Sequence, residues 1–370
     1  IKVNSIKGVG ASTAAITVDN SSGSATANLT TVNSVTMPNG GFLSNRNIII
    51  NGAMLVAQRG TSSTSTGIQT VDRFGLSTAG LDEAMTQAQV DVASGTTPYS
   101  LGFRKAYKIT NGNQTGGAGT SDRCIIYTTL ESQDNANAGW DYTSSSSFTT
   151  LSFWAKSSVA QTFYLALTTQ DGTQQRYGAA ITFSSADTWT KFTYKIPGNS
   201  NIQFDNNNER GLQIYWTLFR GTGTTDNSFP INQWAAYNSS IRYPDFTSTW
   251  FTTNDATFEL TGVQLEVGSV ATDFEHRSFA QELALCHRYC NAIMQYGTGD
   301  TASNRIYNQN YAGHGFAVQS IPRMRAEPTI TYTIVNGTIS GDFSSNDRIQ
   351  MIDDNNNNFR IYDVLCEAEL

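Results

Sequence analysis

The stretch TLSFWAKS, residues 150–157, alternates between side chains suited to a core and side chains suited to a surface. Successive side chains of a β-strand point to opposite sides, so one face of this stretch carries Leu151, Phe153 and Ala155. The other face carries Ser152, Trp154 and Lys156. The stretch therefore predicts a half-buried strand of an antiparallel sheet.

The same period of two recurs downstream. Segments of this kind follow one another from Asn47 to about Phe274, separated by Gly, Asn, Asp and Ser turns and without helical interludes. Eight or more such strands predict an all-β fold with two packed sheets. The residues expected in its core include Phe153, Leu165, Phe192, Ile214, Trp216, Leu218 and Leu265.

Two local signals predict departures from regular strands. In FELTGVQLEV, residues 258–267, the apolar positions change parity, so one extra residue has to be absorbed near Gly262 as a β-bulge. In TITYTIVNGTIS, residues 329–340, the pair Asn336 and Gly337 predicts a hairpin turn.

Four parts are expected along the chain. Residues 1–45 form a short β segment with too little apolar content for a core of its own, so it either packs on the main domain or on neighbouring copies, or serves as a flexible linker. The β-sandwich covers 46–277, one helix covers 278–294, and a small C-terminal β domain covers 295–370.

The helix is predicted from its first turn and from its apolar spacing. Ser278 and Gln281 form a capping box. The apolar seam that follows faces either the sandwich or two further copies of itself about a threefold axis. Its members are Phe279, Leu283, Cys286, Cys290 and Ile293.

Composition limits the possible partners. Only 14% of the residues are charged, and the net charge of −7 would repel the phosphates of a nucleic acid. The 23 Lys and Arg are scattered along the sequence, so we expect no nucleic-acid partner. No apolar run is long enough for a membrane helix, and the first residues lack the apolar core of a signal peptide, so neither membrane insertion nor signal-directed secretion is expected. The four cysteines have no framework spacing and are predicted to be free thiols.

Several stretches together resemble a family of bacteriophage tail-fibre and host-attachment proteins, of the type common in marine and cyanobacterial phages. The similar segments include NIIINGAMLVAQRGTS, LSFWAKSS, TWTKFTYKIPG, FPINQWAAYN and, most specifically, FELTGVQLEVGSVATDFEHRSFAQELALCHRYC. The resemblance implies a jelly-roll β-sandwich akin to carbohydrate-binding modules, a location on the virion and a homotrimeric fibre that contacts other tail or capsid proteins.

Candidate sugar-binding residues are aromatic, because an aromatic ring stacks on the apolar face of a pyranose. Trp154, Tyr164, Tyr215 and Phe219 are expected to point away from the core, and they form a platform if their strands are neighbours. The alternative is that another part of the chain or another subunit covers this face. The segment 227–251 is a second candidate, as a binding loop. It carries the aromatic residues Trp234, Tyr237, Tyr243 and Trp250 and the polar residues Asn232, Gln233, Arg242 and Asp245.

No catalytic group can be assigned from the sequence, so we expect a protein that is not an enzyme. The three histidines, at positions 276, 287 and 314, belong to no Ser–His–Asp pattern, and Asp353 and Asp354 fit a solvated turn better than a catalytic pair. No metal or other cofactor is expected, apart from a structural calcium ion as a remote option. Its candidate ligands are Asp72, Asp255 and Asp273.

The sequence thus leads to three hypotheses. The first is a virion protein, a tail fibre or receptor-binding protein assembled in the host cytoplasm, that adheres to host surface glycans through many weak contacts. The second is a structural fibre or decoration protein of tail or capsid without glycan specificity. The third, less favoured, is a polysaccharide depolymerase.

Overall fold

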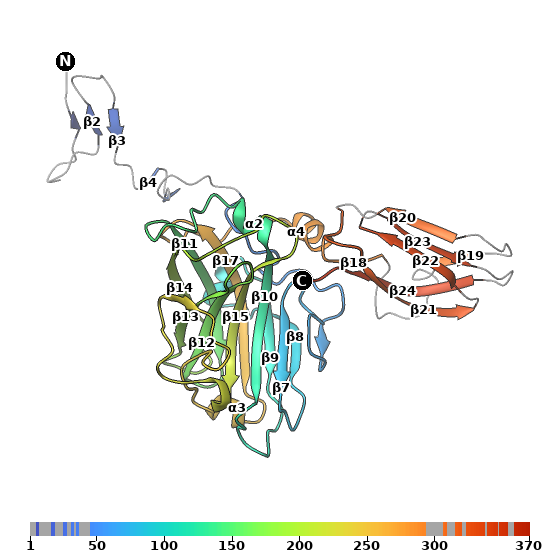
Figure 1. Ribbon diagram of the computed structural model, residues 1–370, viewed down its shortest axis with the longest axis horizontal. Coiled ribbons are helices and arrows are strands. Elements are labelled where there is room, and N and C mark those ends of the chain that lie inside the picture. Colours follow the sequence, from blue (N-terminus) through green and yellow to red (C-terminus); the bar gives the residue numbers. More distant parts are fainter. Residues whose placement is uncertain are drawn as a thin grey trace. The chain divides into compact units, whose positions relative to one another are not determined.

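The structure is a computed structural model. It describes residues 45–293, 323–336, 339–346, 348–353 and 359–370, and in addition the strands at 5–6, 16–18, 25–27, 31–32, 35–36, 306–308 and 315–319. The chain divides into two compact units, Ile1–Ser44 and Asn45–Leu370, of which the second contains all helices and most strands described (Figure 1).

The described residues of the first unit form five short strands. Three of them form an antiparallel sheet in the order β1-β2-β3, and the other two pair with each other. They are β1 (Ser5–Ile6), β2 (Ile16–Val18), β3 (Ala25–Ala27), β4 (Thr31–Val32) and β5 (Val35–Thr36).

The centre of the second unit is a sandwich of two six-stranded antiparallel sheets, which confirms the predicted all-β jelly roll. We name each sheet after one of its inner strands. The β15 sheet has the order β16 (Trp234–Ala236), β13 (Gln175–Thr182), β12 (Thr162–Thr169), β15 (Arg210–Arg220), β10 (Arg123–Glu131), β7 (Gly75–Ala79). The β17 sheet has the order β14 (Thr190–Pro197), β11 (Phe148–Ser157), β17 (Thr257–Val267), β9 (Lys105–Thr110), β8 (Thr86–Asp91), β6 (Ser62–Ser63).

The core between the two sheets contains the residues that strand alternation predicts. Phe153 from the β17 sheet meets Trp216 from the β15 sheet edge to face, with ring centroids 5.6 Å apart. Leu165, Ile214, Leu218 and Leu265 are buried in the same core. Phe192 is only partly buried, because it lies on the edge strand β14, but it packs on this core.

The predicted β-bulge at Gly262 is confirmed. The β11–β17 register shifts so that Gly262 and Val263 together oppose the single residue Phe153. Gly262 has a φ of +63°, which favours glycine, and a Cβ atom there would lie 2.7 Å from the ring of Phe103.

The described helical segments are short. The predicted capping box of Ser278 and Gln281 is present, but the helix α4 spans only Phe279–Cys286, and Cys290–Ala292 form strand β18. The helix buries Glu282 and Cys286 toward the sandwich rather than the whole predicted seam, since Phe279 is 57% exposed. The others are α1 (Thr97–Ser100), α2 (Ser132–Ala136), α3 (Thr249–Thr252) and the 3-10 turn η1 (Thr222–Thr224).

The C-terminal strands form two further sheets. β24 pairs with β18, β19 and β21, whereas β23 pairs with β20 and β22. The predicted hairpin at Asn336 is therefore wrong, because β21 and β22 belong to different sheets. The bounds are β19 (Ile306–Asn308), β20 (Gly315–Gln319), β21 (Thr329–Asn336), β22 (Ile339–Ser345), β23 (Arg348–Asp353) and β24 (Phe359–Glu367).

A buried ion-pair network joins the start of the sandwich to the end of the chain. Arg59 pairs with Asp72, with Glu367 at 2.6 Å and with Glu369 at 3.0 Å. Arg73 pairs with Glu369 and lies over the ring of Tyr289. The side chains of both arginines are 3% exposed, so these charges depend on their partners.

The four cysteines are free and buried, as predicted. Among the described residues, none of the helices combines the length and the apolar character that crossing a membrane requires.

Candidate ligand-binding groove

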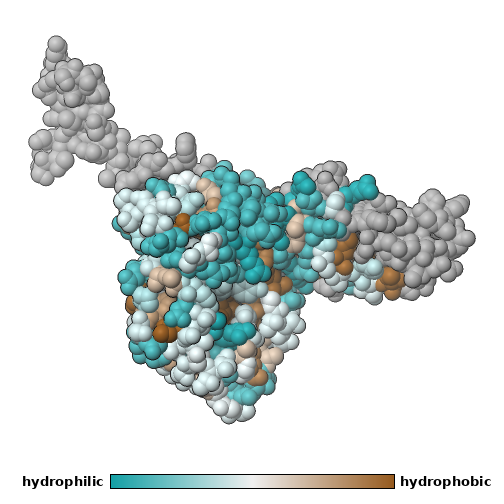
Figure 2. Space-filling model, in the orientation of Figure 1, coloured by the Kyte–Doolittle hydropathy of each residue, from teal (hydrophilic) through white to brown (hydrophobic). Residues whose placement is uncertain are grey.

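An open groove lies on the face of the β15 sheet that points away from the core. Its volume is about 400 Å³, and its walls come from β7, β10, β12, β13 and β15 and from the loop after β16. Strands β12, β15 and β10 run side by side in Figure 1, and on this side of the sandwich hydrophilic and neutral residues predominate in Figure 2. The lining residues are Ser77, Arg123, Ile125, Thr168, Gln170, Gln174, Arg176, Gln213, Tyr215, Arg220, Tyr237, Arg242 and Tyr243.

Strand alternation explains why these side chains face the groove. Gln213 and Tyr215 alternate with Leu212, Ile214 and Trp216, which are buried in the core. The register then brings outward positions of neighbouring strands together, since Gln213 opposes Thr168 of β12 and Tyr215 opposes Tyr127 of β10.

Four arginines line the groove. Arg123 and Arg220 are direct partners across β10 and β15, Arg176 comes from β13, and Arg242 comes from the loop. None of the four forms an ion pair within the described part of the chain. Burial, followed by the neighbouring charge of Arg242, lowers the pKa of Arg220 to about 10.

Arg176 is held in place by three tyrosines. Its Nη2 donates to the hydroxyl of Tyr243 at 2.6 Å, and its guanidinium lies 4.3 Å from the centre of that ring. The rings of Tyr237 and Tyr215 are 5.5 and 5.6 Å away. Arg176 is only 6% exposed, so the tyrosine faces compensate part of the cost of burying its charge.

Two buried polar atoms on groove residues lack a partner. Arg176 Nε and Thr168 Oγ1 make no hydrogen bond to the residues that the structure describes. Buried polar atoms usually have a partner, and those without one often mark a place where a ligand or a water molecule binds.

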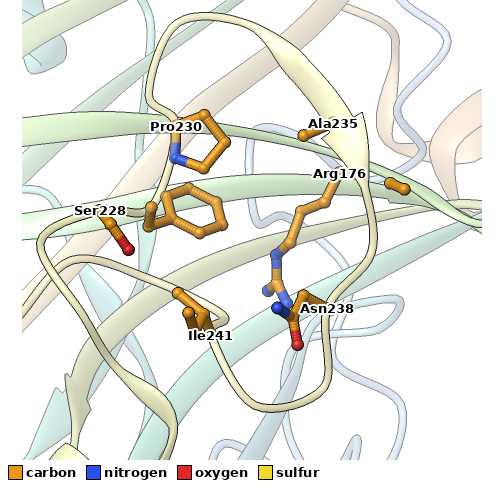
Figure 3. A pocket seen from close by; sticks show the side chains of 8 residues that line it. Arg176, Ser228, Pro230, Ala235, Asn238 and Ile241 are labelled. Carbon is orange, nitrogen blue, oxygen red and sulfur yellow. The ribbon is translucent and has the colours of Figure 1, made fainter.

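The loop between β15 and α3 also encloses a smaller pocket of about 200 Å³ (Figure 3). Figure 3 shows Arg176, Ser228, Asn238 and Ile241 around this pocket. Arg176 therefore lines both the pocket and the groove.

Phe229 fixes the base of the loop, because its ring packs where the strand residue Gly178 has no side chain. A Cβ atom on Gly178 would lie 2.4 Å from that ring.

The structure brings together three of the aromatic sugar-binding candidates. Tyr215, Tyr237 and Tyr243 line the groove, although Tyr243 is only 1% exposed and offers its hydroxyl rather than an open face. The predicted platform of Trp154 beside Tyr164 is wrong, because β11 and β12 belong to different sheets. Trp154 instead lines a separate pocket of about 260 Å³ with Phe103 and Phe274.

The remaining candidates have structural contacts. Tyr164 packs edge to face on Phe246, with centroids 4.9 Å apart. The outward position predicted for Phe219 is wrong, because its ring is buried and stacks on Phe251 with centroids 4.3 Å apart. The indole of Trp234 donates to the carbonyl of Pro197 at 2.7 Å. Trp250 is fully buried in the core, and its indole donates to the carbonyl of Thr257 at 3.0 Å. No face of Trp250 is open to a ligand, which corrects its assignment to a binding loop.

Arg242 belongs to the predicted binding loop, but the other arginines and the glutamines of the groove were not predicted as site residues. The Lys and Arg are scattered in the sequence, but strand pairing gathers four of the arginines on one face. The sequence does place Gln213 and Arg176, two polar residues, at outward positions of strands. Recognising that they share one groove requires the order of the strands, which the sequence does not show.

Within the described part of the chain, the candidate acidic and histidine residues are not gathered into one site. Asp72 is buried and accepts hydrogen bonds from Gln58, and within the described residues no three His, Cys, Asp or Glu side chains are grouped to hold a metal ion. Asp72, Asp255 and Asp273 therefore do not come together as calcium ligands. His314 and Asp354 lie outside the described residues, and Asp353 ends β23.

No family model matches the chain, and no curated protein matches it. Among solved structures, the enzymatically active domain of tailspike protein 4 from bacteriophage CBA120 is similar over 60% of this chain and 21% of its own, at 11% identity and a TM-score of 0.34. The chain thus spans about a fifth of that protein. A putative sugar binding protein from Bacteroides thetaiotaomicron is similar over 60% of this chain and 100% of its own, at 12% identity and a TM-score of 0.29. TmCBM61, solved in complex with β-1,4-galactotriose, is similar over 60% of this chain and 100% of its own, at 9% identity and a TM-score of 0.28. These likenesses assign no family to the chain.

Proposed function

We propose that the groove of the β15 sheet binds a saccharide and that the chain acts without catalysis as a receptor-binding protein. The carrying observation is the combination of half-buried tyrosines with amide side chains along one open groove. Tyr215 and Tyr237 supply aromatic surface, while Gln170, Gln174 and Gln213 supply donors and acceptors for sugar hydroxyls. An open groove accepts a polymer that extends beyond both of its ends.

The types of residue that line the groove support a binding role without catalysis. Its described lining residues include no aspartate, glutamate or histidine, whereas glycoside hydrolysis ordinarily requires a pair of carboxyl groups. His276 lies elsewhere, against the rings of Phe103 and Phe274, with its Nε2 2.9 Å from the carbonyl oxygen of Leu101.

The location proposed for the chain is the virion, on a tail or another surface appendage assembled in the host cytoplasm. The resemblance of its segments to tail-fibre proteins supports this. A homotrimer is proposed as well, because Phe279 and Leu285 on α4 are exposed large apolar side chains that self-association would cover. Several weak sites on one particle would together give firm adhesion.

A glycan array probed with the full chain tests the binding role. Tyr237→Ala should weaken binding to any array hit by about 1–3 kcal/mol, because a stacking face is lost. Tyr99→Ala is the matched control, since Tyr99 lies before strand β9 of the other sheet and stacks on Arg104.

Three outcomes would each contradict one part of the proposal: the glycan binding, the absence of catalysis or the trimer. An array without any bound glycan would favour a purely structural fibre or decoration protein. Release of reducing ends from a host polysaccharide would show a depolymerase. A stable monomer in light scattering at micromolar concentration would exclude the trimer.

A further inference from the structure

The groove concentrates positive charge on a protein that is acidic as a whole. The net charge of the chain is −7, yet four guanidinium groups and no carboxylate line this surface, counting its described residues. The arginines come from β10, β13, β15 and the loop before α3. They therefore come together only when these strands pair in the folded sheet.

Several buried or half-buried arginines elsewhere in the described part of the chain have carboxylate partners. Arg59 pairs with three carboxylates and Arg73 with Glu369, and Arg288 binds both oxygens of Glu131 at 2.6 and 2.7 Å. The groove arginines differ from this pattern. Their mutual repulsion is unfavourable in the free protein, and a bound anion would relieve it.

The free nitrogens of these arginines are suited to an anion. Arg220 and Arg242 each use Nε locally, toward Thr224 and Ser239 respectively. Across the described residues, the terminal nitrogens of Arg123, Arg220 and Arg242 have no hydrogen-bond partner. The planar guanidinium presents two parallel N–H groups, which match the oxygens of a carboxylate or a sulfate.

We propose that the groove selects glycans that carry acidic groups, namely carboxylate or sulfate substituents on the sugar. Arg123, Arg220 and Arg242 bind the acidic groups, the rings of Tyr215 and Tyr237 contact the sugar faces, and Arg176 is a positioning residue held by Tyr243. The inference rests on the proposed glycan binding and adds its charge class. The unpartnered Thr168 hydroxyl supplies one further hydrogen bond to the ligand.

A nucleic acid carries the same kind of charge, but the molecule favours a glycan. The net charge of −7 opposes the long-range attraction that nucleic-acid binding uses. The amides of Gln170, Gln174 and Gln213 suit a ligand that is rich in hydroxyl groups.

The test measures binding of the full-length chain to four polymers by titration calorimetry. Polygalacturonate presents carboxylates, dextran sulfate presents sulfates, dextran is the uncharged counterpart of the latter, and polyuridylate presents phosphates. We expect binding to one or both acidic polysaccharides, weaker binding at about 0.5 M salt because charges are then screened, and no measurable binding to dextran.

The variant Arg220→Gln with Arg242→Gln should bind the acidic polysaccharide roughly 10- to 100-fold more weakly, since two charge-assisted contacts are lost. The variant Arg220→Lys with Arg242→Lys keeps both positive charges and should retain part of the affinity. That result would show that the glutamine variant binds weakly because charge is lost and not because the chain is misfolded. Arg104→Gln is the control, because Arg104 is exposed and lies outside the groove, where it hydrogen-bonds to the carbonyls of Tyr99 and Phe103 and lies over the ring of Tyr99. Its affinity should equal that of the unaltered chain.

Each contrary outcome has a distinct meaning. Equal binding of dextran and dextran sulfate, unaffected by the arginine changes but lost in Tyr237→Ala, overturns acidic selection and leaves glycan binding intact. Failure of both acidic polysaccharides to bind overturns acidic selection, and an empty glycan array overturns the proposed function as well. Tighter binding of polyuridylate than of either polysaccharide, lost in the double glutamine variant, shows a nucleic-acid site instead.

Discussion

Arg123 and Arg220 oppose each other directly in the ladder between β10 and β15. Both side chains point to the outer face of the β15 sheet and line the same groove. Like charges in this relationship are destabilising in an antiparallel pair, and no carboxylate in the described lining offsets them. The pair therefore lowers stability in a place where it can serve binding.

Arg123→Gln should raise the free energy of unfolding in the absence of ligand. The expected gain is about 0.2–1 kcal/mol at low ionic strength, the usual size of a cross-strand charge effect, and it should vanish at high salt. Urea denaturation at the two ionic strengths measures it. A loss of stability that is independent of salt would show that Arg123 has an attractive partner.

Arg59→Gln should have the opposite and larger effect. The substitution leaves Asp72, Glu367 and Glu369 without their shared cation, and Asp72 is fully buried. We expect a loss of about 3–5 kcal/mol in the free energy of unfolding. Lys105→Gln is the matched control, because its partner Asp91 is 81% exposed and such surface pairs contribute about 1 kcal/mol or less.

Asp134 should make stability fall as the pH rises. Burial, followed by the charge of Glu131, raises the pKa of Asp134 from 3.8 to about 6. Between pH 3.8 and about pH 6, the folded chain keeps a proton on Asp134 that the unfolded chain has released. The contribution of Asp134 to the free energy of unfolding is therefore complete below pH 3.8 and is lost as the pH rises above about 6.

Asp134→Asn removes this titration. Relative to the unaltered chain, the variant should gain about 1–2 kcal/mol in free energy of unfolding between pH 4 and pH 7, after allowance for partial exposure. Denaturation at several pH values measures the difference. A difference that is constant across this range would show that Asp134 titrates normally.

Thr217→Val should stabilise the sandwich. Thr217 is fully buried, and its hydroxyl has no hydrogen-bond partner among the described residues. A methyl group of similar size removes the cost of that hydroxyl, with an expected gain of about 1 kcal/mol.

Thr149→Val is the control for this change. Thr149 is also buried on a strand, but its hydroxyl donates to the carbonyl of Glu266 at 2.9 Å. Its replacement should destabilise the chain by about 1 kcal/mol, as measured by thermal or chemical unfolding. The same sign for both variants would contradict the assignment of the Thr217 hydroxyl.

The sequence by itself determined the properties that depend on neighbouring residues. The alternation in 150–157 placed Phe153 in the core and Trp154 outside it, because the side-chain period of a strand is two. The change of parity located the bulge at Gly262, and the spacing of Ser278 and Gln281 located the start of α4. Each of these features is decided within a few residues of chain.

Only the tertiary structure decided which strands are neighbours. Local alternation is the same for every half-buried strand, so it did not show that Trp154 and Tyr164 lie on different sheets. Pairing depends on closing long loops and filling one shared core, which no short stretch of sequence specifies. For the same reason Arg123 and Arg242, more than a hundred residues apart, line one groove only when the whole β15 sheet has formed.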